Sequence, residues 1–153
     1  MNILIRIGMF FSLLLVLIGC DSVNLSKATN YEEAPPALKL TIEEIEITTH
    51  RGTYAWSYFD KSTGQQVTVQ ADHAPPTEMV NIEQGTKVNL SQPIKLDFEI
   101  EPTQYEIRLW NSSNIIKTYN SFGEIKEKGK YIIEIAGTWG DNIATYVVAL
   151  EIE

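Results

Sequence analysis

The chain has 153 residues, enough for one domain with a hydrophobic core, and 44% of them are hydrophobic. Its formal net charge is −8 at pH 7. An acidic surface repels phosphate backbones, which disfavours nucleic-acid partners, and it offers no polybasic patch for anionic lipids. No motif typical of a cofactor site is present, so we expect no cofactor and no nucleic acid.

The N-terminal twenty residues carry the most specific signal in the sequence. Arg6 supplies a short positive region, residues 7–18 are almost entirely apolar, and Gly19 precedes Cys20, the only cysteine. An apolar run of this length suits a signal peptide better than a membrane-spanning helix. Residues 17–20, Leu-Ile-Gly-Cys, resemble the lipobox of bacterial lipoproteins. The resemblance implies a signal peptide over residues 1–19, a diacylglyceryl group on Cys20, and a lipid anchor on the extracytoplasmic face of the cytoplasmic membrane.

Residues 20–36 are predicted to form the lipidated cysteine and a flexible tether. The segment is rich in Ser, Asn, Thr and Glu, and it ends at Pro35 and Pro36. So few apolar residues cannot bury enough surface to offset the entropy of ordering the chain. We therefore expect the folded domain over residues 37–153. Because an acylated Cys20 leaves no free thiol, this domain is expected to be held together by its core alone.

From Leu38 onward, apolar and polar residues alternate with the period of half-buried strands. The alternation shifts phase between Ile42 and Ile45, which predicts two short strands or one bulged strand. Turn-forming residues lie at 60–64, 111–114 and 137–142, and residues 76–80 suit one helical turn. The pattern predicts an all-β domain, an antiparallel immunoglobulin-like β-sandwich. Further strands are expected over residues 52–59, 66–70, 87–90, 94–100, 105–110, 115–119, 130–136 and 143–152.

The last predicted strand, over residues 143–152, is expected to lie inside a sheet. Its alternation places Tyr146, Val148, Leu150 and Ile152 on one face and Thr145, Val147, Ala149 and Glu151 on the other. Its partner across the loop that contains Trp139 is expected to be the strand with Tyr131, Ile133 and Ile135.

Two histidines raise the possibility of a metal site. If the turn at residues 60–64 closes a hairpin, Phe59 pairs with Gln65 and His50 lies near His73, beside Asp72. Two histidines and a carboxylate can hold a divalent metal. A register error of one residue would place one histidine on the opposite face, and two ordinary exposed histidines are the alternative.

Asp72 and His73 also resemble part of a hydrolase triad, with Ser57 or Ser62 as the conceivable nucleophile. The sequence lacks the Gly-x-Ser-x-Gly turn that presents such a serine. We therefore expect no enzyme, and an envelope hydrolase ranks last among the hypotheses.

The aromatic residues offer a different kind of site. In a sandwich without disulfides, most of them are expected to form the core, and we assign Trp56 and Trp110 to it. Trp139 lies in a predicted glycine-flanked loop, which makes it the candidate for an exposed binding contact.

Four short motifs are scattered through the domain: Gly-Thr-Tyr-Ala-Trp at residues 52–56, Val-Gln-Ala-Asp at 69–72, Ala-Pro-Pro at 74–76 and Trp-Gly at 139–140. These motifs resemble those of small uncharacterised lipoproteins of Gram-positive, Bacillus-like bacteria. Some relatives carry cysteines at positions corresponding to Ala55 and about Gln70, which implies that these two positions face each other. The resemblance supports the localisation and the fold, and it implies no catalytic activity.

The sequence thus predicts a membrane-anchored, non-enzymatic binding or adaptor module at the cell envelope. Its expected partner is an envelope protein or a cell-wall glycan. The alternative is a metal or small-solute binding protein that uses His50 and His73.

Overall fold

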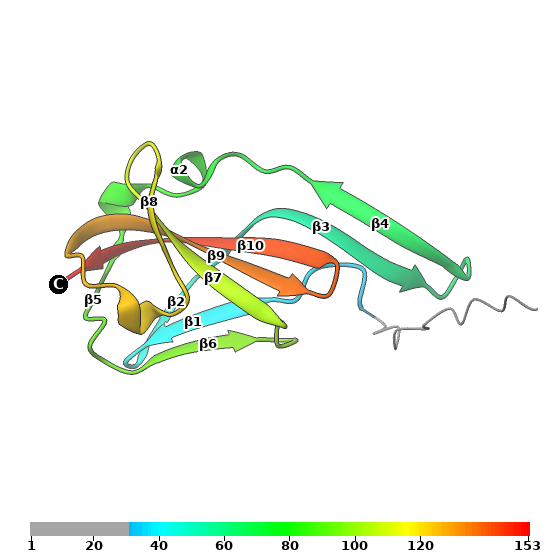
Figure 1. The fold of residues 1–153 in the computed structure, drawn as a ribbon, viewed down its shortest axis with the longest axis horizontal. Helices are drawn as coiled ribbons and strands as arrows, with labels where there is room; N and C mark the ends of the chain where they lie inside the picture. The colour runs from blue at the N-terminus through cyan, green and yellow to red at the C-terminus, as the bar shows by residue number, and fades with distance from the viewer. Residues whose placement is uncertain (1–30) are drawn as a thin grey trace, which may run out of the picture.

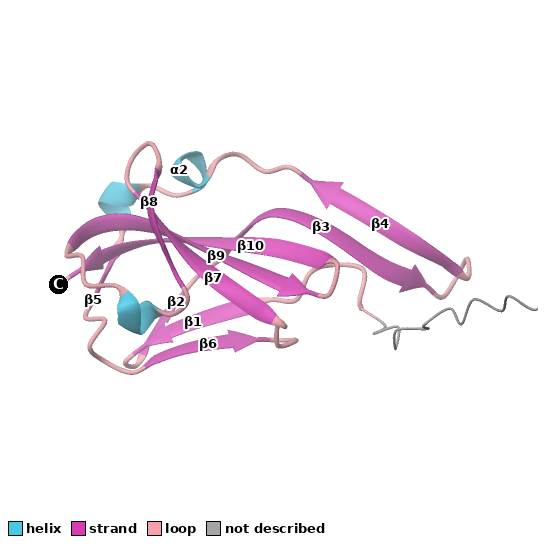
Figure 2. Cartoon of the chain, in the orientation of Figure 1, coloured by secondary structure: helices cyan, strands magenta, loops and turns pink. Residues whose placement is uncertain are grey.

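In the computed structural model, which describes residues 31–153, the chain folds into two packed β-sheets (Figures 1 and 2). Sheet A has three strands in the order β2-β1-β6. Sheet B has seven strands in the order β4-β3-β10-β9-β7-β8, with β5 pairing β10. The strands are β1 (Leu38–Ile42), β2 (Ile45–Ile47), β3 (His50–Asp60), β4 (Gln65–Ala71), β5 (Thr86–Val88), β6 (Ile94–Phe98), β7 (Gln104–Trp110), β8 (Ile115–Tyr119), β9 (Gly129–Trp139) and β10 (Asn142–Ile152).

The predicted antiparallel β-sandwich is confirmed, and its immunoglobulin-like character stays a prediction. The phase shift after Ile42 is a tight hairpin, because β1 and β2 pair through Ile42 and Ile45. Glu43 in this turn has a φ of 58°, in the left-handed region.

The centre of sheet B is the long hairpin of β9 and β10. Tyr146 pairs with Ile135, and Val148 pairs with Ile133, as the sequence predicts. On its other side, β10 pairs antiparallel with β3 near its beginning and parallel with β5 near its end. The last strand therefore has hydrogen-bonded neighbours along both of its edges and lies inside the sheet, as the sequence predicts.

The core lies between the two sheets and is one continuous cluster. Its largest fully buried side chains are Trp56, Trp139 and Tyr146. The Trp139 ring meets the Trp56 ring edge-on at 5.4 Å between centroids and the Phe98 ring at 5.9 Å. Such edge-to-face pairs add to the stabilisation that burial of the rings provides.

The segment from Tyr31 to Pro36 packs against sheet B. Pro35 and Pro36 are buried, and the Tyr31 ring lies edge-on to Trp56 at 5.1 Å between centroids. Three side chains of the sheet donate hydrogen bonds to carbonyls of this segment: Trp56 to Glu32 at 2.9 Å, Arg51 to Pro35 at 2.7 Å, and Tyr146 to Pro36. Residues 31–36, which the sequence assigns to the tether, therefore pack against the folded domain in the structure. Proline lacks an N–H and cannot join a sheet ladder, so these carbonyls are satisfied by side chains instead.

The hairpin of β3 and β4 extends past the beginning of β10 (Figure 1). The last β3–β10 pair is Ala55 with Ile143, whereas β3 continues to Asp60. We call residues 56–69, which lie past this point, the arm. The predicted hairpin is confirmed, but its register differs by one residue, because Phe59 pairs with Gln66. Ala55 faces Gln70, which agrees with the expectation from the resemblance.

The remaining elements are short helices: α2 (Pro76–Met79), η2 (Ile82–Gln84) and η3 (Phe122–Glu124). α2 is the helical turn that the sequence predicts, and it contacts β3 and β9. No helix within residues 31–153 has the length and apolar composition needed to cross a membrane.

Candidate functional site

A hollow of about 570 Å³ lies on the outer face of sheet B. Its position follows from strand alternation. Ile133 and Ile135 of β9 face the core, so Glu134, Ala136 and Thr138 face outward. Small outward side chains on β9 and β10 leave space between longer side chains on β7. The lining residues are Thr53, Gln104, Tyr105, Glu106, Arg108, Asn120, Glu134, Ala136, Gly137, Thr138, Ile143, Ala144 and Thr145.

A charged cluster forms one wall of this hollow. Glu134 is only 6% exposed and is the cross-strand partner of Arg108. One Glu134 carboxylate oxygen accepts hydrogen bonds from Trp110 Nε1 at 3.0 Å and from Arg108 Nη1 at 3.4 Å. Arg108 Nε donates to Glu106 at 2.6 Å. A buried carboxylate is tolerated here because each charge in the cluster has a partner.

The electrostatics of the cluster keep Arg108 charged. Partial burial acts to lower the pKa of the Arg108 guanidinium, but the Glu106 hydrogen bond and the Glu134 charge outweigh it and raise the pKa. The cluster holds two carboxylates and one guanidinium. It therefore presents a small net negative charge whose members already bond one another, and it disfavours an anionic ligand.

The rest of the lining is uncharged and polar. Thr53, Thr138 and Thr145 supply hydroxyl groups, and Gln104 and Asn120 supply amides. Hydroxyl and amide groups both donate and accept hydrogen bonds. The hollow can thus bind a ligand rich in hydroxyl groups without having to break the ion pairs beside it.

Trp110 is not in the core, contrary to its sequence assignment. It lies on the same face of β7 as Arg108, half-buried, with its indole N–H on Glu134. The prediction failed because tryptophan suits two environments. Its ring can be buried in a core, or it can lie half-buried with the indole N–H bonded to a polar partner. Trp56, by contrast, is fully buried as predicted.

Trp139 is not an exposed contact, and that prediction is wrong. It is 2% exposed, and its indole N–H donates to the Ile100 carbonyl at 2.8 Å. β9 continues through Gly137 and Thr138 to Trp139, so only Gly140 and Asp141 form the turn before Asn142. Gly140 has a φ of 62°, which glycine adopts at little cost. Trp139 is an even number of residues from Ile133 and Ile135, so its side chain points to the same, core-facing side of β9. This signal was present in the sequence.

The two histidines lie apart from this hollow. β3 pairs with β4 only from Tyr54 onward, and His50 pairs instead with Val147 of β10. The His73 ring lies tilted beside the Tyr54 ring, at 6.4 Å between ring centroids. Within residues 31–153, no three His, Cys, Asp or Glu side chains gather as metal ligands would. His50, Asp72 and His73 therefore do not form the predicted site in this part of the chain.

The two serines considered as nucleophiles have other partners. The Ser57 hydroxyl shares a hydrogen bond of 2.7 Å with Thr68, and the Ser62 hydroxyl donates to Asp60 at 2.7 Å. Cys20, the proposed lipidation site, lies outside the described residues.

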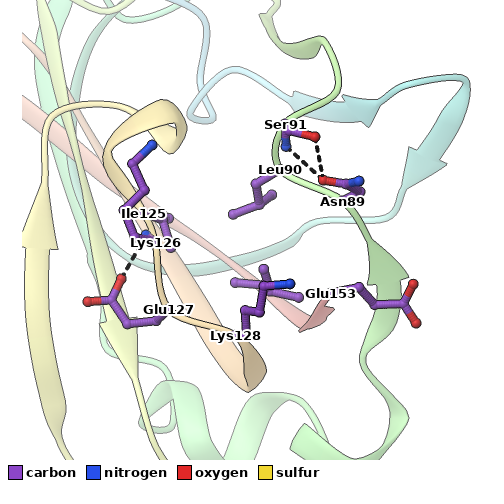
Figure 3. A pocket seen from close by; sticks show the side chains of 9 residues that line it. Asn89, Leu90, Ser91, Ile125, Lys126, Glu127, Lys128 and Glu153 are labelled. Atoms are coloured by element: carbon purple, nitrogen blue, oxygen red, sulfur yellow. Dashed lines mark hydrogen bonds between the residues drawn. The ribbon is translucent and has the colours of Figure 1, made fainter.

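A second, smaller hollow of about 360 Å³ lies where the segments around Asn89 and Lys126 meet (Figure 3). Glu127 accepts hydrogen bonds from Tyr119 and from the Lys126 backbone N–H, and these lower the pKa of Glu127 to about 2. Asn89 and Ser91 bond each other in a local turn. This hollow holds no buried charged side chain, so we take the outer-face hollow of sheet B as the candidate site.

Sequence reasoning missed Glu134 and Arg108. The available signal was a single glutamate within the apolar run of residues 131–136 and a single arginine within residues 107–110.

Comparison with protein-family models, curated proteins and solved structures gave no match.

Proposed function

We propose that this protein is a lipid-anchored, non-enzymatic binding module of the bacterial cell envelope, held through Cys20 on the extracytoplasmic face of the cytoplasmic membrane. Its ligand is a cell-wall glycan that binds in the outer-face hollow of sheet B. One observation carries the ligand class: threonine hydroxyls and amides line the hollow, while the charged residues beside it are paired with one another. Uncharged polyhydroxylated ligands match such a lining.

Two features favour binding over catalysis. The carboxylate of Glu134 is engaged by Trp110 and Arg108, and neither histidine lines the hollow. A general base must lie within hydrogen-bond reach of a bound substrate, and the residues best suited to that task lie elsewhere.

An envelope protein is the second candidate ligand. Ile143 lines the hollow and is 49% exposed, and an exposed large apolar side chain beside a polar hollow suits a protein interface.

Calorimetric titration of the full-length chain in detergent with soluble cell-wall glycan fragments tests the ligand. Thr138→Val removes one lining hydroxyl without changing the side-chain volume. A hydrogen bond contributes about 0.5–1.5 kcal/mol, so we expect Kd to rise about 2- to 10-fold. Thr41→Val is the matched control, because Thr41 lies on β1 in sheet A.

Equal weakening by both variants would refute the location of the site. Absence of any heat with the unsubstituted chain would refute the glycan. A photo-crosslinking residue at position 143 would then test the envelope protein, with capture expected only in intact cells.

The anchor is tested separately by metabolic labelling with a fatty acid analogue. The unsubstituted chain should incorporate the label, and Cys20→Ala should not, because the thioether forms at that sulfur. Label retained in the variant would overturn the anchor.

A further inference from the structure

The outer edge of β4 is an unprotected strand edge. Among residues 31–153, β3 is the only strand that pairs with β4, along seven consecutive residues without a bulge. Natural edge strands avoid unwanted pairing by using lysine, proline, bulges or very short length. β4 contains neither charge nor proline, and its sequence is Gln-Gln-Val-Thr-Val-Gln-Ala.

The other edges of the two sheets do carry such protection. β8 contains Lys117, and its pairing with β7 is interrupted by a register shift. β6 carries Lys95 and Asp97, and β2 has only three residues. The exception at β4 therefore points to a strand edge that is used for pairing.

The sequence of β4 is symmetric about its centre. Residues 66–70 read Gln-Val-Thr-Val-Gln in both directions, with Thr68 in the middle. Two copies of the strand paired antiparallel about Thr68 would place Val67 opposite Val69 and Gln66 opposite Gln70. Cross-strand pairs of β-branched residues stabilise sheets, and glutamine amides both donate and accept hydrogen bonds.

Charge and shape favour a second copy over other partners. The chain carries a net charge of −8, so most faces of two copies repel each other, whereas β4 is neutral. The antiparallel register also places Asp72 of one copy opposite Gly64 of the other, in the turn that carries Lys61. Because the arm extends past β10, the two sandwiches would lie at opposite ends of a shared four-stranded ribbon (Figure 1).

We propose that β4 is the contact strand of a two-fold symmetric dimer of this chain, with Thr68 on the symmetry axis. The two arms form one continuous antiparallel sheet. The interaction surface is independent of the outer-face hollow, so the dimer and the proposed ligand are separate properties.

Cysteine crosslinking of the full-length chain in membranes tests the register. Directly opposed residues in antiparallel strands have Cα atoms about 4.5–5.5 Å apart, within the range of a disulfide. Thr68→Cys should give a reducible dimer upon mild oxidation. Lys61→Cys is the matched control, because it is also exposed on the hairpin but lies far from the axis. The unsubstituted chain measures the background of crosslinking through Cys20.

Equal crosslinking of Thr68→Cys and Lys61→Cys would overturn the proposal. So would crosslinking of Thr68→Cys only to a different protein, or no crosslinked product at all.

Sedimentation of the detergent-solubilised full-length chain provides an independent measurement. Thr68→Lys places two ammonium groups opposite each other on the axis, so we expect dimerisation to weaken at least about tenfold. Thr68 is exposed and bonds only Ser57, so the variant should remain folded. Ser113→Lys adds the same charge in the exposed turn between β7 and β8 and should sediment as a dimer. A monomeric unsubstituted chain, or dimeric Thr68→Lys, would contradict the proposal.

Discussion

The sandwich and the arm are built from strands of similar composition but are stabilised in different ways. In the sandwich, β9 and β10 bury Ile133, Ile135 and Leu150 completely between the two sheets. In the arm, no residue of β4 is buried, and Phe59 of β3 is 42% exposed. The arm depends on its hydrogen-bond ladder, its turn and a few side-chain contacts at its base.

The difference shows how a two-stranded hairpin can persist without a second layer. An isolated hairpin is marginally stable in water. Here the base is held by Trp56, which belongs to the core, and by Asn142, whose side chain accepts from the Ser57 N–H at 2.7 Å and donates to the Ser57 carbonyl at 3.0 Å. The Asn142 amide thus takes the place of one further residue pair at the beginning of β10.

The largest effect should come from the core. Trp139→Ala removes a buried ring that contacts Trp56 and Phe98, and we expect it to lower the free energy of unfolding by about 3–5 kcal/mol. Phe59→Ala in the arm should change it by less than about 0.5 kcal/mol. Urea denaturation of the full-length chain measures both. Similar losses would mean that the arm is as tightly packed as the sandwich.

An intermediate effect is expected at the junction. Asn142→Ala leaves both backbone groups of Ser57 without their partner, at a cost of about 1–3 kcal/mol. Hydrogen exchange should accelerate first at residues 56–60. Asp141→Ala, in the adjacent exposed turn, serves as the control and should leave exchange in the arm unchanged. Acceleration spread evenly over sheet B would show that arm and sandwich open together.

The smallest effect concerns the turn of the arm in acid. Hydrogen bonds from Ser62 and Thr63 lower the pKa of Asp60 from 3.8 to about 2. A carboxyl group whose pKa is depressed by folding stabilises the turn above pH 4, and that contribution is lost as the pH falls towards 2. NMR titration of the carboxyl group should give the depressed pKa, and exchange at the Ser62 amide should rise over the same range. Asp60→Asn should abolish this pH dependence. An ordinary pKa at Asp60 would show that the turn is open in solution.

Much of the fold follows from local sequence. Period-two alternation located most strands, and the pairing of β9 with β10 was correctly inferred from matching apolar faces. The hairpin register was wrong by one residue, because the turn at residues 61–64 is closed by Asp60 and Gln65. A single residue matters in a strand, since it moves a side chain to the other face.

The candidate site was not predictable in the same way. The Arg108–Glu134 pair depends on the placement of β7 beside β9, which are separated by β8 and η3 in the sequence. No local pattern specifies which distant strands become neighbours. The contacts of residues 31–36 were missed for a similar reason. A segment of low hydrophobicity stays disordered when nothing binds it, but here side chains of sheet B donate hydrogen bonds to its backbone carbonyls.

The attachment of residues 31–36 to sheet B also determines how mechanical load enters the molecule. Tension applied upstream of Tyr31 would first reach the hydrogen bonds from Trp56, Arg51 and Tyr146 to the backbone of this segment. Burial raises the pKa of Tyr146 to about 12, so its hydroxyl remains a donor across the physiological range. Force would therefore pass directly to β3 and β10, two neighbouring strands of the larger sheet, before it reaches β1 at residue 38. A protein tethered at Cys20 would bear a pull through two interior strands of its larger sheet and not through its first strand.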